Sequence, residues 1–200
     1  MSVDDGLLLQ LSHQQMEGVR QARLDRDVAR DELAGAGLAR QRARDSVEIA
    51  KRERAVVRAE IDVSELRLEI ASERGTLGEV AEAKASRAWL NARVAELGQV
   101  IVVGKLEGRQ AQVAFELAAE RVRLREAQVV MEKARALAGL SSAVVGDETV
   151  RRAESDVQVR YGRVQALQTR AQAAATEVKA AREHLGELES VSASLRPVSS

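Results

Sequence analysis

Two histidines have a carboxylate nearby at helical spacing. His13 precedes Glu17 by four residues and His184 precedes Glu187 by three, so each pair would lie on one face of a helix. Imidazole and carboxylate groups bind zinc, but a protein zinc site needs at least three such ligands, and the chain has no HExxH pattern. We therefore interpret both histidines as solvent-exposed and expect no metal site and no catalytic triad.

A glycine-bounded segment at residues 98–106, GQVIVVGKL, comes nearest to a nucleotide-binding motif. A phosphate loop has four residues between its glycines and a Ser or Thr after the Lys, because backbone N–H groups and that hydroxyl hold the phosphates and the magnesium ion. Here five residues separate Gly98 from Gly104, and Leu106 follows Lys105. We expect no cofactor and no small-molecule substrate.

Arg121, Arg123 and Arg125 form a short basic run that could bind phosphate groups. Glutamates at positions 116, 120 and 126 lie among them, a pattern typical of the solvent-exposed flank of a coiled coil. The whole chain has 31 basic and 31 acidic residues, whereas affinity for nucleic acid depends on an excess of Lys and Arg. We expect no nucleic-acid partner.

The composition favours long helices over a compact globular domain. The 200 residues include one Trp, one Tyr, one Phe and one Pro, and they include no Cys, which excludes disulfides and thiol catalysis. The most apolar run, residues 100–103, is far shorter than the ~20 residues that span a bilayer. Residues 1–11 lack the basic start of a signal peptide. We expect a cytoplasmic protein, and the excess of Arg over Lys, 26 to 5, favours a bacterial genome.

The clearest periodicity lies in the C-terminal third of the chain. Apolar residues recur there at spacings of three and four, which keeps one face of a helix toward a partner helix, as in a coiled coil. Asp147 can cap the first turn, so we expect a coiled-coil helix over residues 147–192 and a disordered tail over 193–200. The seam consists of Val150, Ala153, Val157, Arg160, Val164, Leu167, Ala171, Ala174, Val178, Ala181, Leu185 and Leu188.

Residues spaced seven apart form a second coiled-coil seam further upstream. Its polar members are Arg52 and Glu73, and such residues, like Arg160 in the first seam, select register or partner number at some cost in stability. Before residue 49 the register weakens, at Arg42 and Gly35. The seam consists of Ile49, Val56, Val63, Ile70 and Leu77, with Ala59, Leu66 and Val80 between them.

Three segments are candidates for turns. Residues 139–148 combine Gly and Ser between two seams that are out of register, and we place a helix end there. At residues 74–79, Gly75 could end one helix while Thr76 and Glu79 form a capping box for the next, but Leu77 stays in the register of the seam. At residues 98–108, Gly104 and Gly108, four residues apart, weaken a helix. We leave the turns near 75–78 and 98–108 open, within a long helical region over residues 1–140.

The sequence thus predicts an all-α protein, an elongated antiparallel coiled coil or bundle of two or three long helices. Thin helices of this kind lack the concave pocket that binds a substrate, so we expect no enzyme. We expect a structural protein, a stalk, spacer or scaffold of a larger bacterial assembly, which binds proteins or itself through its seams. Trp89 is the candidate anchor for a partner, because a buried Trp often dominates an interface.

Two formats of known protein are similar to this one. The long helices and the scarcity of aromatic residues look like the antiparallel coiled-coil stalks of flagellar and type III export ATPases, which implies a role in protein transport. The chain also resembles the phage-shock-type helical scaffolds that polymerise on membranes. For that alternative, Leu7, Leu8, Leu9 and Leu11 supply an apolar patch, while Asp4 and Asp5 would repel anionic lipid.

Overall fold

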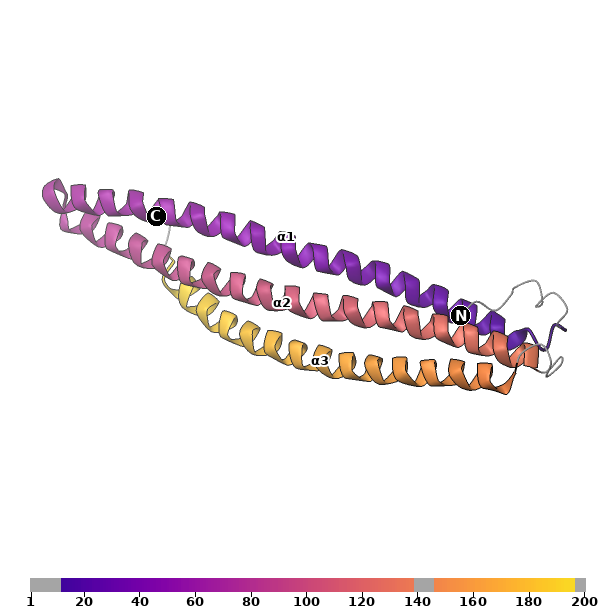
Figure 1. The fold of residues 1–200 in the computed structure, drawn as a ribbon. Helices are drawn as coiled ribbons and strands as arrows, with labels where there is room; N and C mark the ends of the chain where they lie inside the picture. The colour runs from indigo at the N-terminus through magenta and orange to yellow at the C-terminus, as the bar shows by residue number, and fades with distance from the viewer. Residues whose placement is uncertain (1–11, 139–145, 197–200) are drawn as a thin grey trace. The chain divides into compact units, whose positions relative to one another are not determined.

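The protein is all-α, as the sequence predicts, and has three long helices. The computed structural model describes residues 12–138 and 146–196 (Figure 1). Helix α1 (Glu17–Arg74) has 58 residues, α2 (Leu77–Ala138) has 62 and α3 (Asp147–Ser194) has 48, and neighbouring helices pack antiparallel. The fold is therefore a three-helix bundle. Most of the segment expected to end the second helix, residues 139–145, lies outside the described residues.

A two-residue turn joins α1 to α2. The N–H of Gly75 donates to the carbonyl of Ala71 at 2.9 Å, and a Cβ at position 75 would lie 2.5 Å from that oxygen, so only glycine fits. The N–H of Thr76 donates to Glu79 Oε2 at 2.6 Å, and the N–H of Glu79 donates to Thr76 Oγ1 at 3.3 Å. This is a capping box. The Thr76 N–H also lowers the pKa of the Glu79 carboxyl.

Residues 98–108, the other segment where a turn was left open, are helical, and α2 continues through them. One of the glycines there, Gly104, serves close packing. A Cβ on Gly104 would lie 2.7 Å from Val47 Cγ2 on α1, and one on Gly98 would lie 3.7 Å from the guanidinium of Arg54. The loss of helix propensity at Gly104 is offset by a close approach of α1 and α2.

The chain divides into two compact units, and each helix contributes a stretch to both. The first unit contains Met1–Arg40 and Ala111–Gln172, and the second contains Gln41–Gln110 and Ala173–Ser200. In the first unit, residues of α2 such as Val122 and Ala134 are buried. In the second, Val47, Ala50 and Ile101 form an apolar cluster between α1 and α2. Each unit therefore has its own buried residues.

Candidate interaction surface

Helix α3 has one apolar seam, and the bundle covers it. Every residue of the seam predicted from Val150 to Leu188 is buried or half-buried, and apart from Thr149, Glu154 and Ser192 the remaining positions of α3 are exposed. Val164 in the first unit is 5% exposed and Val178 in the second is 4% exposed. The sequence therefore identified the face with which α3 packs inside its own chain.

The row of residues through which helix α1 packs against the bundle differs from the seam predicted over residues 49–77. We call this row the packing seam; it has the spacing of three and four typical of a coiled coil, and its members are buried or half-buried. Ala, Ser or Val occupies every second position, so the helices can approach closely. In the first unit the packing seam contains Val19, Ala22, Arg26, Ala29, Leu33, Ala36 and Arg40. In the second it contains Ala43, Val47, Ala50, Arg54, Val57, Ile61, Ser64, Leu68 and Ala71.

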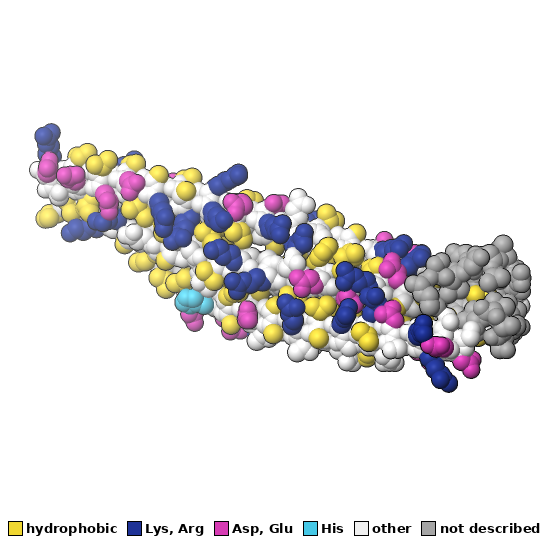
Figure 2. All heavy atoms as spheres, in the orientation of Figure 1, with side chains coloured by type: hydrophobic (Ala, Val, Ile, Leu, Met, Phe, Trp, Pro, Cys, Tyr) yellow, Lys and Arg dark blue, Asp and Glu magenta, His cyan; other side chains and the backbone are white. Residues whose placement is uncertain are grey.

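Eight further large apolar residues of α1 lie on another face, which we call the free seam. Its exposed fractions run from 49% at Val63 to 64% at Ile70. The members are Leu24, Val28 and Leu38 in the first unit, and Ile49, Val56, Val63, Leu66 and Ile70 in the second. All of them fall in one heptad register, with spacings of three, four and seven from Ile49 to Ile70 and wider gaps of ten and eleven residues on either side of Leu38. Figure 2 shows hydrophobic side chains exposed along α1 near the end that turns into α2.

The seam predicted from Ile49 to Leu77 is thus not the face that contacts α2. The packing seam follows it by one residue, since Ala50, Val57, Ser64 and Ala71 come directly after its members. At 3.5 residues per turn the two seams lie roughly 150° apart on the helix. Gly104 of α2 lies against Val47 of the packing seam, where a Cβ at position 104 would come 2.7 Å from Val47 Cγ2. Arg52 and Glu73 are exposed on the free seam, and Leu77 is 93% exposed.

Arg160, the polar exception in the α3 seam, compensates a buried carboxylate. Its Nη1 lies 3.5 Å from Oε1 of Glu120 on α2, and its Nε donates to Asp156 at 3.2 Å. Glu120 is 5% exposed and also accepts from Arg123 at 3.0 Å. Without these guanidinium groups, burial of this carboxylate would be costly. The sequence pattern does not single out the two buried glutamates, Glu96 and Glu120, although each has an Arg three residues away with which it pairs.

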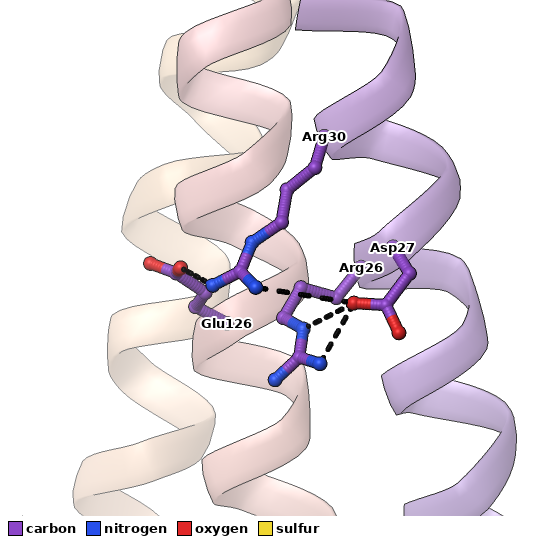
Figure 3. Close-up of polar contacts among 4 residues, drawn as sticks. All are labelled: Arg26, Asp27, Arg30 and Glu126. Carbon is purple, nitrogen blue, oxygen red and sulfur yellow. Dashed lines mark hydrogen bonds and ion pairs between the residues drawn. The ribbon is translucent and has the colours of Figure 1, made fainter.

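Arginines and acids tie α1 to α2. Figure 3 shows Arg30 of α1 reaching Glu126 of α2, with Asp27 beside it; the Arg30–Glu126 pair measures 3.0 Å. Two members of the predicted basic run pair in the same way, Arg121 with Glu32 at 3.2 Å and Arg125 with Asp25 at 3.3 Å. In the second unit Arg87 pairs with Glu65 at 2.6 Å. Arg121 and Arg125 are thus paired with α1, and Arg123 pairs with Glu120 on α2 itself, so each arginine of the run has an acidic partner.

Similar pairs join α2 to α3. Arg135 contacts Glu154 at 2.7 Å in the first unit, and this hydrogen bond raises the pKa of the arginine. Arg182 contacts Glu107 at 2.6 Å in the second unit, where the side chain of Gln99 also donates to the carbonyl of Ala181 at 3.2 Å. All the pairs between helices named here have one partner on α2. Helix α2 is thus the element that both other helices contact in each unit (Figure 1).

The aromatic residues pack within the units. Phe115 lies under the guanidinium of Arg40, 4.6 Å from its ring centroid, and a Cβ on Gly37 would be 3.7 Å from the ring. Trp89 is half-buried in a groove of about 680 Å³ between α2 and α3, with Glu96 and Arg196 on its walls. Trp89 therefore reaches a surface groove, and its role as a partner anchor stays a prediction.

The histidines lie apart from any ligand cluster. His184 Nδ1 is 3.1 Å from Glu187 Oε2 on exposed α3, and His13 contacts Arg20. Among residues 12–138 and 146–196, no group of three or more His, Cys, Asp and Glu side chains could hold a metal ion. The grooves of the described surface lie between helices and mix ion-paired charges with apolar side chains; one at the α1–α2 turn, of about 450 Å³, contains Arg67, Arg74 and Ile70.

Comparison of the chain with protein-family models, with curated proteins and with solved structures finds no match. In the part of the chain that the structure describes, no helix has the length and apolarity needed to cross a membrane. The feature that distinguishes this surface is the free seam of α1, which has the spacing of a coiled-coil interface and is exposed along its described length.

Proposed function

We propose that this protein is a non-enzymatic coiled-coil interaction protein that binds a partner helix through the free seam of α1. Helix α2 holds α1 by its packing seam, so the large apolar residues of the free seam point to solvent. In this proposal the bundle serves as a stalk, spacer or scaffold of a larger assembly, and a bacterial secretion or export apparatus is the kind of assembly that its format fits.

The observation that carries this proposal is the regular spacing of exposed Ile, Val and Leu on α1. Scattered exposed apolar residues are normal on any protein, but a heptad row of them is what one helix presents to another. Each Å² of apolar surface that a partner covers contributes about 25 cal/mol to binding. A partner helix along this row would cover several such side chains at once.

In-cell photocrosslinking with the full chain tests the proposal. A photoreactive amino acid at Val56, on the free seam, should give one discrete crosslinked protein, while the same amino acid at Arg58, which is exposed but off the seam, should not. Asp substitutions at Ile49 and Val63 should abolish the Val56 crosslink without changing the melting temperature of the purified chain. Equal crosslinking at positions 56 and 58, or none at Val56, would count against the proposal.

A membrane-surface scaffold is the second candidate, because an exposed apolar row could also enter a lipid interface. Such helices carry Lys and Arg on their polar face, whereas five of the exposed residues beside the free seam in the second unit are acidic: Glu48, Glu53, Glu60, Asp62 and Glu69. The leucines of residues 1–11 lie outside the described residues. We expect the chain to stay in the supernatant when vesicles that contain phosphatidylglycerol are sedimented.

A further inference from the structure

Resting on the proposed function, we infer that the partner of the free seam is an α-helix with an apolar heptad row and basic flanks, not a second copy of this chain. The relevant surface lies wholly in the second unit. It runs along α1 from Ile49 to Ile70, with Val56, Val63 and Leu66 between them, and these five side chains are 49–64% exposed. At 1.5 Å per residue the row is about 32 Å long, which is enough to contact three heptads of a partner.

Acidic side chains border this row on both sides. In heptad terms, the flanking positions on one side hold Glu48, Asp62 and Glu69, and those on the other hold Glu53 and Glu60; all five are exposed. Glu48 pairs with Lys51 at 2.6 Å. The carboxylates of the other four have no ion pair with any residue that the structure describes. Arg67 and Arg74 are the basic residues at these flanking positions, and both lie near the turn.

Unpaired charges beside an apolar row determine which helix can lie on it. In coiled coils the flanking positions of one helix face those of the other, and opposite charges there select the partner. Four carboxylates without partners therefore favour a helix with Lys or Arg at its flanking positions. Arg52, within the row and exposed, favours a polar or acidic residue at the layer opposite it.

A second copy of the chain fits this surface poorly. In a parallel, in-register pair each seam residue faces its own copy, so Arg52 would face Arg52 and Glu73 would face Glu73. In an antiparallel pair each flank faces the same flank of the other copy. The side with Glu48, Asp62 and Glu69 then faces itself, whereas on the other side Glu53 and Glu60 can face Arg74 and Arg67. Like charges held opposite each other oppose association. Anionic lipid is disfavoured on the same ground.

Two synthetic helical peptides of four heptads test the inference. Both have Ile and Leu in the apolar row; one has Lys and the other Glu at all flanking positions. With the full-length chain, fluorescence anisotropy should show the Lys peptide binding at least about tenfold more tightly than the Glu peptide, and added salt should weaken its binding. Equal affinity for the two peptides, or binding of neither, would overturn the inference.

Variants of the chain separate the apolar row from its charges. Val56→Asp with Val63→Asp should lower the affinity for the Lys peptide by about tenfold or more, whereas Val102→Asp, at a 44% exposed valine of α2, should leave it unchanged. Glu53→Lys with Glu60→Lys should reverse the preference, so that the Glu peptide binds better. Circular dichroism on each variant checks that the helices are retained, and retained preference after the charge reversal would contradict the inference.

The same samples distinguish failure of this inference from failure of the proposed function. Sedimentation equilibrium should show no dimer that depends on Val63; a dimer lost in Val63→Asp would make the second copy the occupant and overturn the inference, while the seam would remain an interaction surface. Binding to phosphatidylglycerol vesicles that Val63→Asp abolishes would overturn both. A Val56 photocrosslink in cells, with no preference between the peptides, would overturn the inference alone.

Discussion

Helices α1 and α3 both carry heptad patterns, but they use them differently. All the apolar seam of α3 lies against the bundle, with Val164 and Val178 at most 5% exposed. Helix α1 has two seams, and one of them, the free seam, is left exposed. A heptad pattern therefore predicts a surface suited to a partner helix, but it does not show whether that helix belongs to the same chain.

The packing seam of α1 alternates small and large side chains. Ala, Ser or Val at every second position lets the backbones come close, and Gly104 of α2 lies against Val47. Leu33, Ile61 and Leu68 are the largest apolar members of this seam. Arg26, Arg40 and Arg54 share this seam, since their long stems can lie along the interface. Helix α3 has no second row of comparable apolar residues, so it packs in the bundle through its single apolar seam.

The largest expected effect comes from one substitution made on each helix. Val178→Asp places a charge at a 4% exposed seam position of α3 and should lower the free energy of unfolding by about 3 kcal/mol or more. Val63→Asp, on the free seam, should change it by no more than about 0.5 kcal/mol. Urea unfolding followed by circular dichroism measures both. Similar losses from the two variants would break the contrast between the helices.

A side chain at Gly104 should disturb the α1–α2 contact next most strongly. Gly104→Val overpacks against Val47, and we expect a loss of about 1–3 kcal/mol in the free energy of unfolding. Gly108→Ala, four residues on with open space around the new Cβ, is the matched control and should stabilise the chain by up to about 1 kcal/mol. If both glycines tolerate the change equally, α1 does not approach α2 at Gly104.

Removal of the polar seam residue of α3 should have an effect of similar size. Arg160→Met leaves buried Glu120 with fewer charge partners, and we expect a loss of about 1–3 kcal/mol in unfolding experiments. Because this loss comes from leaving the Glu120 carboxylate buried without Arg160, the double variant R160M with E120L should recover most of the free energy of unfolding. A double variant as unstable as R160M would show that Arg160 acts mainly by packing.

The smallest effect is expected at the turn. Thr76→Ala removes the capping hydroxyl of α2 and should cost about 1 kcal/mol. The Thr76 N–H lowers the pKa of Glu79 in the folded chain. The ionised carboxylate therefore stabilises the fold above its ordinary pKa of 4.5, and this stabilisation is lost as the pH falls through the lowered value. The Glu79→Gln variant should lose less stability than the native chain as the pH is lowered below about 4.5, as measured by thermal unfolding at each pH.

Much of the fold follows from local rules that the sequence displays. The all-α class, the single seam of α3 and the Thr76–Glu79 capping pattern depend on spacing and on short-range hydrogen bonds, which a sequence shows directly. The packing seam of α1 was missed because Ala, Ser and Arg carry little hydrophobic signal beside Ile49 and Val56. Which face of α1 packs against α2 also depends on glycines of α2, which are distant in sequence from α1. Helix propensity alone marks those glycines only as residues that weaken a helix.

The candidate surface was predictable as a pattern but not as an exposed one. Ile49, Val56, Val63 and Ile70 were chosen from their spacing, and exposure depends on which helices the chain supplies to cover them. The buried Glu96 and Glu120 were missed for a related reason, because carboxylates are normally placed at the surface unless a partner is known. Only the fold shows that Arg93 and Arg160 lie close enough to pair with them.

The chain has no Cys, so single cysteines report on one position at a time, and adjacent residues of α1 provide the most direct test. Val63 belongs to the free seam and is 49% exposed, whereas Ser64 belongs to the packing seam and is 6% exposed. We predict that a thiol reagent labels Val63→Cys nearly as fast as the urea-unfolded chain, while Ser64→Cys and Val178→Cys are strongly protected. Protection of Val63→Cys equal to that of Ser64→Cys would contradict the account, because the free seam would then be covered.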